Sequence, residues 1–214
     1  MINVRRRGLC DYQSVLAEMR RYTDTRGPES DDEIWLLEHP PVYTLGLGAS
    51  SEHVLQETSI PVVRTDRGGQ VTYHGPGQLV VYLLLNLAGR GLRVRELVRR
   101  AEQAIIDLLR GDYDAEAQRR AGAPGVYVDD AKVAALGFRI RRGCCYHGLA
   151  LNVDMDLRPY QYINPCGFRG LRVMDLKTLG VRDDVQAVGE RLLLHLLAQF
   201  ELAQAAPLAA GAER

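Results

Sequence analysis

Cys166 stands in a loop that suits a reactive thiol. It lies within residues 163–168, which read INPCGF. Pro165 fixes the backbone before the cysteine, Gly167 leaves room beside the sulfur, and no helical or strand periodicity runs through the segment. A thiol presented in this way is accessible, whereas structural cysteines prefer packed positions. The loop makes Cys166 a candidate nucleophile, although an unreactive thiol fits the same local pattern.

A cysteine nucleophile needs a partner that favours its thiolate, and two residues fit that role. Lys132 enters the otherwise small and apolar run 132–137, KVAALG. A cation beside the sulfur would lower the pKa of a thiol from its usual value of about 8.5. The second residue, His147, lies in the run 146–148, YHG. A hydrated lysine at the start of a surface strand is the alternative interpretation of Lys132, and the pattern leaves both open.

The remaining cysteines do not indicate a metal site. Cys144, Cys145 and His147 give the spacing C-C-x-H, whereas structural zinc sites usually separate their paired cysteines by about two to four residues. No second Cys/His pair lies near them, so we predict no metal and no cofactor. Because no export signal follows Met1, we expect Cys10 and the other cysteines to be free thiols.

A second chemical feature is the glycine-rich segment 66–86, DRGGQVTYHGPGQLVVYLLLN. Glycines at this density let the backbone approach a bound group closely and adopt positive φ angles. The polar residues between them lead into an apolar run at 79–85, which is typical of a strand buried on both faces. The segment predicts a substrate wall, with a tight hairpin built on ordinary turn glycines as the alternative.

Apolar periodicity predicts the helices and strands that position these residues. A helix is expected after the N-cap Asp11, a second over 94–111 and a third after the N-cap Asp183. Strands and helices mix without strict βαβ alternation, which predicts an α+β fold. We expect one domain over residues 1–203 and a flexible tail at 204–214. The expected strands are residues 33–38, 61–65, 79–85, 125–128, 132–141 and 146–153.

Charge and hydropathy argue against several classes of function. The 214-residue chain has no formal net charge at pH 7, which argues against nucleic-acid binding. Its longest apolar run is far shorter than the roughly 20 residues needed to span a bilayer, so no membrane association is expected. Without an apolar segment after Met1, we expect a cytoplasmic protein. Two arginine-rich stretches, 90–100 and 139–142, are either solvated faces or a dock for an acidic partner.

Four ordered motifs resemble those of one enzyme family. They are RGGQVTYHGPGQ, then APGVYV with AKVAALGFRIRRG, then HGLALNV, then INPCG. The series resembles the lipoyl(octanoyl) transferases, the octanoyl-[acyl-carrier-protein]:protein N-octanoyltransferases of lipoate synthesis, and it covers about residues 11–200. The resemblance implies the fold of the catalytic domains of biotin and lipoate protein ligases. In that fold a mixed β-sheet is flanked by helices and the acyl group lies in a tunnel.

The resemblance also implies roles for individual residues. It implies that Cys166 carries the acyl thioester and that Lys132 assists it. No role follows for residues 169–178 or for the turn at 46–48. Three segments are implied to bind the acyl group, and their residues are Arg67, Gly68, Gly69, Gln70, Val71, Thr72, Tyr73, His74, Ala135, Leu136, Gly137, Gly148, Leu149 and Ala150.

The implied reaction needs no ATP, because it converts a thioester into an amide. The Cys166 thiolate attacks the thioester of octanoyl-acyl carrier protein, and the ε-amine of a lysine then attacks the acyl-enzyme. Lys132, once acylation has neutralised its thiolate partner, is expected to act as the base for this amine. The expected acceptors are the lipoyl domains of 2-oxoacid dehydrogenase E2 subunits and the glycine cleavage H protein.

Two other functions stay open at this level. A lipoate or biotin protein ligase on the same fold would activate the acid with ATP. Lys132 suits such a ligase, but an adenylating enzyme needs no thiol at Cys166. A non-catalytic acyl-carrier adaptor would use the glycine-rich groove only to hold the acyl chain, and a trapped covalent adduct would exclude it.

Overall fold

The computed structural model describes residues 2–27, 29–168 and 170–201. The side chains of Ser51, Cys166 and Glu201 lie outside the described part of the chain, and so does the tail expected at 204–214. Two β-sheets and three α-helices make up the described residues, with short 3₁₀ turns between them.

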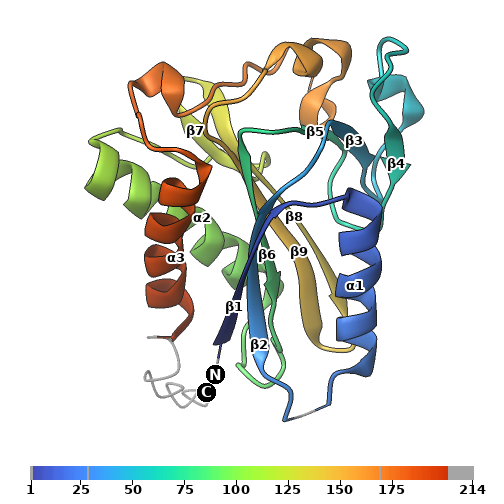
Figure 1. The fold of residues 1–214 in the computed structure, drawn as a ribbon, viewed down its shortest axis with the longest axis vertical. Helices are drawn as coiled ribbons and strands as arrows, with labels where there is room; N and C mark the ends of the chain where they lie inside the picture. The colour runs from blue at the N-terminus through green and yellow to red at the C-terminus, as the bar shows by residue number, and fades with distance from the viewer. Residues whose placement is uncertain (1, 28, 169, 202–214) are drawn as a thin grey trace, which may run out of the picture.

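A six-stranded mixed sheet forms the centre of the fold (Figure 1). The first two strands in spatial order are parallel, and all other neighbours are antiparallel. The apolar run at 79–85 lies in the middle of this sheet, where it is buried throughout as predicted. In spatial order the strands are β1 (Ile2–Leu9), β2 (Asp32–Glu38), β6 (Gln78–Leu84), β9 (Cys144–Asn152), β8 (Ala131–Arg141) and β7 (Val126–Val128).

Helices cover both faces of this sheet, so the α+β prediction is confirmed (Figure 1). Helix α1 (Tyr12–Thr25) lies on one face, where its apolar stripe packs against Trp35 of β2. Helices α2 (Val94–Tyr113) and α3 (Val185–Glu201) lie on the other face and share the main hydrophobic core with β6 and β9. The buried apolar residues of these helices recur with the 3.6-residue period expected from the sequence.

Side-chain caps mark the starts of two helices. Asp11 accepts a hydrogen bond from the backbone N–H of Ser14 at 2.8 Å, which confirms it as the N-cap of α1. The predicted cap of α3, Asp183, is wrong by one residue, because Asp184 accepts from the backbone N–H of Ala187 at 2.8 Å. The Asp183 carboxylate instead accepts hydrogen bonds from side chains of α2 and α3.

A smaller sheet of three strands stands beside one end of the large sheet (Figure 1). Its order is β4 (Val62–Arg64), β3 (Val42–Leu45) and β5 (Val71–His74). Strand β5 belongs to the glycine-rich segment, and antiparallel pairing with β3 makes it a strand rather than a loop. The 3₁₀ turns are η1 (Ser51–His53), η2 (Arg158–Tyr162), η3 (Pro165–Gly167) and η4 (Lys177–Leu179).

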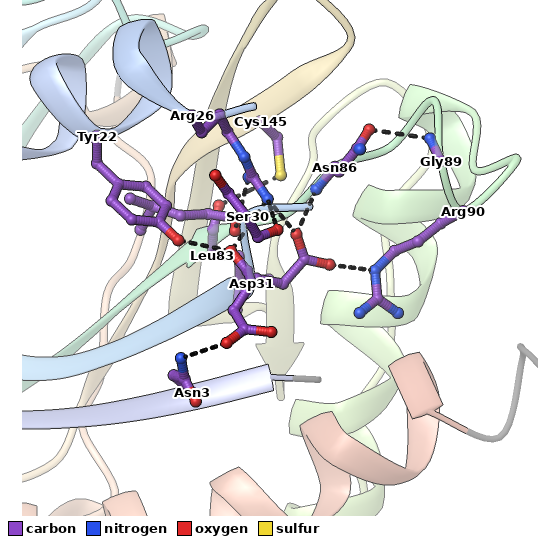
Figure 2. A network of polar contacts seen from close by, with 12 residues as sticks. Asn3, Tyr22, Arg26, Ser30, Asp31, Leu83, Asn86, Gly89, Arg90 and Cys145 are labelled. Carbon is purple, nitrogen blue, oxygen red and sulfur yellow. Dashed lines mark hydrogen bonds and ion pairs between the residues drawn. The ribbon is translucent and has the colours of Figure 1, made fainter. Parts of the chain in front are cut away.

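A buried ion-pair network closes the other end of the large sheet (Figure 2). The Asp32 carboxylate accepts from Arg26 Nη2 at 2.7 Å and from Arg90 Nε at 2.5 Å. It also accepts from the backbone N–H of Asn86 at 2.7 Å, and Arg90 reaches the carbonyl of Phe200 at 3.1 Å. One carboxylate therefore joins the end of α1, the β6–α2 connection and α3 to the start of β2.

Candidate functional site

Lys132 is a buried cation in strand β8. The residue is 3% exposed, and its Nζ donates a hydrogen bond to the carbonyl of Pro124 at 3.0 Å. Nζ also lies 5.2 Å from the centre of the Tyr127 ring. Gly125, at a φ of 141°, lets the adjoining segment pass close by, since a Cβ there would lie 3.2 Å from Nζ. The hydrated surface lysine considered from the sequence is therefore wrong.

The predicted nucleophile occupies a single 3₁₀ turn. Cys166 is the middle residue of η3, and its backbone is described whereas its side chain is not. Thr72, Lys132 and Pro165 line one small cavity, so the cysteine turn borders the buried lysine. Two segments that are distant in the sequence thus meet at this point.

The segment after the cysteine turn anchors the backbone of Lys132. The N–H of Lys132 donates to the carbonyl of Arg172 at 2.8 Å, and its carbonyl accepts from the N–H of Met174 at 3.0 Å. The side chain of Asn152 donates to the Met174 carbonyl at 2.9 Å. Part of the segment 169–178, to which no role was assigned from the sequence, therefore anchors β8 at the position of the lysine.

A cleft of about 400 Å³ extends from Lys132 along β8 and β9. The glycine-rich loop closes onto the free edge of β8, where the N–H of Gly68 donates to the carbonyl of Phe138 at 2.8 Å. Every residue of the three predicted acyl-binding segments except Tyr73 lines this cleft. The cleft is also lined by residues to which the sequence interpretation gave no binding role; they include Tyr12, Val80, Tyr82, Val94, Phe138 and Phe168.

Tyr73 faces away from the cleft. Its ring packs 5.5 Å from the ring of Tyr43 and 5.6 Å from that of Tyr160, measured between ring centres. Successive side chains of a strand point to opposite faces, so Tyr73 turns away from the side on which Thr72 and His74 line the cleft. The expectation that all of residues 67–74 form one acyl-binding wall is corrected at this position.

Small residues let the loop and the strands approach each other around the cleft. A Cβ on Gly137 would lie 2.8 Å from the carbonyl oxygen of Gly68, and a Cβ on Gly148 would lie 1.9 Å from a backbone carbonyl of β6. Ala135 lines the cleft, whereas Ala134 is packed into the main core. Of these two neighbouring alanines, Ala135 is therefore the one on the cleft wall.

Arg67 holds the glycine-rich loop in shape. Its guanidinium donates to the side chain and the carbonyl of Thr44, to the carbonyl of Gly68 at 3.0 Å and to the carbonyl of Gln70 at 2.8 Å. Backbone hydrogen bonds join the turn at 46–48 to the same loop. These contacts make Arg67 a scaffold for the cleft wall.

Two buried histidines, His39 and His74, pack against Tyr12 of α1, and His74 also lines the cleft. Nδ1 of His39 lies 2.6 Å from the carbonyl oxygen of Cys10. A carbonyl only accepts, so Nδ1 donates this hydrogen bond. Its Nε2 then accepts from the hydroxyl of Tyr82 at 2.8 Å. Burial lowers the pKa of His39 to about 4, and burial together with the nearby His39 ring lowers the pKa of His74 to about 3. Both rings are therefore neutral at neutral pH.

His147, the second predicted partner for the cysteine, lies elsewhere. It pairs with Phe138, six residues along β8 from Lys132, which corresponds to about 20 Å of strand. Its Nε2 lies 2.9 Å from Asp66, which also accepts from the hydroxyl of Tyr146 at 2.6 Å. Burial alone would raise the pKa of Asp66, but these hydrogen bonds outweigh burial and hold the pKa well below its usual range. His147 therefore braces the cleft wall far from Lys132.

Cys145 is a poor nucleophile. Burial raises the pKa of its thiol to about 12, and the thiol donates to the carbonyl of Leu83 at 3.2 Å. Cys144 is buried as well, and the half-buried Cys10 donates to the carbonyl of Arg7 at 3.2 Å.

Within residues 2–27, 29–168 and 170–201, no cluster of three His, Cys, Asp or Glu side chains could hold a metal ion. None of the helices formed by these residues has the length and apolar character required to cross a bilayer. Part of the arginine-rich stretch 90–100 is occupied by ion pairs, since Arg90 pairs with Asp32 and Arg100 with Glu96.

The fold corresponds to that of known protein ligases. A bipartite lipoate protein ligase from Thermoplasma acidophilum superposes with a TM-score of 0.74 at 16% identity, over 94% of this chain and 85% of that one. A biotin protein ligase from Aquifex aeolicus superposes with a TM-score of 0.60 at 12% identity, over 95% and 72% of the two chains. At such identities the likeness concerns the fold, and it confirms the fold predicted from the motifs.

The chain belongs to the lipoyl protein ligase A/B catalytic domain family, which matches residues 11–197. It is 60% identical over 193 residues to the octanoyltransferase of Aromatoleum aromaticum, which covers 90% of this chain and 83% of that relative. The predicted family and enzyme class are thereby confirmed, and the chain is an acyltransferase of the lipoyl(octanoyl) transferase type.

Proposed function

We propose that this enzyme moves an octanoyl group from octanoyl-acyl carrier protein to a lysine of lipoyl domains through a thioester on Cys166. One observation carries the proposal: the buried ammonium of Lys132 lies where the acyl cleft meets the Pro-Cys-Gly turn. A buried cation gains most from an anion beside it, and a Cys166 thiolate supplies that charge. The same attraction keeps the sulfur in its nucleophilic form.

The reaction has two steps in this proposal. The thiolate attacks the carbonyl carbon of the donor thioester, and the carrier's sulfur leaves as the new C–S bond forms. The amine of the acceptor lysine then attacks the acyl-enzyme, forms the C–N bond and expels the Cys166 sulfur. Exchange of one thioester for another is nearly neutral and the final amide is more stable, so no ATP is consumed.

The cleft supplies binding energy for the acyl chain. Its walls carry apolar side chains of β8, β9 and α2 beside the glycine-rich loop. Burial of the seven non-carbonyl carbons of an octanoyl group would contribute on the order of 5 kcal/mol, at about 0.8 kcal/mol for each methylene. Ala135 and Gly137 leave room for the chain between loop and sheet.

The proposed acceptors are the lipoyl domains of 2-oxoacid dehydrogenase E2 subunits and the glycine cleavage H protein. The Thermoplasma acidophilum lipoate protein ligase, which shares this fold, has been described together with its E2 lipoyl domain. Octanoyltransferase relatives over most of the chain support an acceptor of the same kind.

Intact-mass spectrometry tests the proposal. The purified protein is mixed with octanoyl-acyl carrier protein in the absence of ATP, and we expect one octanoyl adduct on the wild-type chain. Cys166→Ala should carry none, while the matched control Cys144→Ala should be acylated as the wild type is. An adduct that forms only with ATP, or one that persists on Cys166→Ala, would contradict the covalent mechanism.

A further inference from the structure

His53 stands against the turn that carries the predicted nucleophile. Gly167 directly follows Cys166, and a Cβ built on Gly167 would lie 3.5 Å from His53 Nε2. The same point lies 3.1 Å from Cγ of Gln70, a residue of the glycine-rich loop. One side of the turn therefore faces a histidine ring and a carboxamide, while Pro165 faces the cavity shared with Lys132.

Backbone pairing fixes this arrangement. The N–H of Asn164 donates to the carbonyl of His53 at 2.8 Å, and Val54 forms an antiparallel bridge with Ile163. The N–H of Leu55 donates to the carbonyl of Tyr162 at 2.8 Å, which extends the same ladder. The segment 53–55 therefore runs alongside 162–164, and this pairing holds the histidine beside the cysteine turn.

Lys132 is enclosed by its neighbours. Its Nζ donates to the Pro124 carbonyl and lies over the face of the Tyr127 ring. The charge of Lys132 can stabilise a thiolate from this position. A group that faces solvent is better placed to take the proton from the lysine ammonium that arrives in the second step.

Resting on the proposed function, we propose that His53 is this proton acceptor and that Gln70 helps to bind the incoming amine. His53 is half-buried, so a side chain arriving from solvent can reach it, whereas Lys132 is enclosed. In the described part of the chain, Oε1 of Gln70 is buried and makes no hydrogen bond. Two acceptors beside Gly167 thus match the several N–H donors of a primary ammonium group.

Each proton of the incoming ammonium group has a destination in this step. The acceptor's ammonium gives one proton to His53 Nε2, and the resulting amine attacks the thioester carbon. The C–N bond forms, the C–S bond breaks, and the second amine proton leaves with the sulfur as the thiol. The protonated His53 releases its proton to water, so the step yields an amide, a free Cys166 and one proton.

Isolated octanoyl-enzyme tests this role. Wild-type protein, His53→Gln and the distant control His195→Gln on α3 are acylated by octanoyl-acyl carrier protein and then mixed with a lipoyl domain or with hydroxylamine. Loss of the octanoyl group is followed by intact mass. Because hydroxylamine is already unprotonated at neutral pH, it needs no base to become nucleophilic.

We expect His53→Gln to be acylated like the wild type and to react normally with hydroxylamine. Its transfer to the lysine should be at least about 100-fold slower, the lower range for loss of a general base. His195→Gln should match the wild type in every step. Transfer to lysine at the wild-type rate by His53→Gln would overturn the inference, and equal slowing with both nucleophiles would reduce His53 to a structural role. If the wild type forms no acyl-enzyme, the proposed function itself fails.

Discussion

Acid should destabilise this protein through two buried histidines, one of which, His74, lines the acyl cleft. His39 and His74 are buried, and their pKa values of about 4 and about 3 lie below the value of 6.5 for an exposed histidine. The unfolded chain therefore binds a proton near pH 6.5 at each site, while the folded chain stays neutral until the pH is much lower. As the pH falls through this window, protonation favours the unfolded state.

The size of the effect follows from the pKa shifts. A pH of 5 is about 1.5 units below the value of 6.5 for an exposed histidine. A histidine that stays neutral only in the folded chain then lowers the free energy of unfolding by about 2 kcal/mol, at about 1.36 kcal/mol per unit. His39 and His74 together therefore lower the free energy of unfolding by about 4 kcal/mol between pH 7.5 and pH 5. His147 adds to the loss, since burial lowers its pKa as well. A typical domain has only about 5–15 kcal/mol of unfolding free energy in total, so this loss is a large fraction of the stability and should be easily measured at pH 5.

Urea titrations of the wild type and His39→Gln at the two pH values measure this directly. The single tryptophan, Trp35, is fully buried, so its fluorescence reports unfolding. His39→Gln should be less stable at pH 7.5, because it loses hydrogen bonds to Cys10 and Tyr82. Its further loss on going to pH 5 should nevertheless be about 2 kcal/mol smaller than that of the wild type. An equal loss in both proteins would refute the argument that His39 is held neutral by burial.

Further substitutions test three other parts of the structure. Lys132→Ala should raise the pH at which Cys166 reacts with iodoacetamide. Lys132→Arg keeps the charge and should retain both half-reactions at reduced rates. If the pH dependence of the iodoacetamide reaction is unshifted in Lys132→Ala, Lys132 has no electrostatic role. Ala135→Leu should shorten the acyl chain that is accepted, as measured by competition between acyl lengths, since overpacking costs about 1–3 kcal/mol. Ala134→Leu should instead lower the free energy of unfolding, as measured by urea titration. If both leave chain length unchanged, β8 does not line the acyl site. Asp32→Asn leaves two buried guanidinium groups without their counter-charge and should cost about 3–5 kcal/mol of unfolding free energy; a loss below about 1 kcal/mol, typical of surface ion pairs, would show that solvent screens the network.

The elements with strong periodicity could be predicted from the sequence, and those defined by pairing partners could not. The helix expected over 94–111 is α2, and the strand expected over 132–141 is β8. Strand β1 was missed because it is an edge strand with three arginines and a mostly exposed pattern. Strand β5 was missed because its four residues lie between glycines, and only the partner strand β3 makes them extended.

Prediction from the sequence has the same limit for single residues of the cleft. Motifs indicated the glycine-rich loop and the small residues of β8 and β9, all of which surround one cavity except for Tyr73. The orientation of Tyr73 depends on which face of β5 packs against the cleft, and local sequence does not specify that face. His53 gave no signal at all, since its place beside the cysteine turn depends on a bridge between segments that are far apart in the chain.

The two half-reactions make opposite demands on a side chain, and the structure separates groups that could meet them. Thioester exchange needs a positive charge beside the sulfur, and Lys132 lies enclosed by a carbonyl and an aromatic ring next to the cysteine turn. Aminolysis needs a proton acceptor that a side chain arriving from solvent can reach, and the half-buried His53 has this position. If Lys132 performed both tasks, Lys132→Arg would stop after acylation, because arginine cannot act as a base in proteins. If the tasks are divided, Lys132→Arg still transfers the octanoyl group and His53→Gln does not, so this pair of variants decides between the two mechanisms.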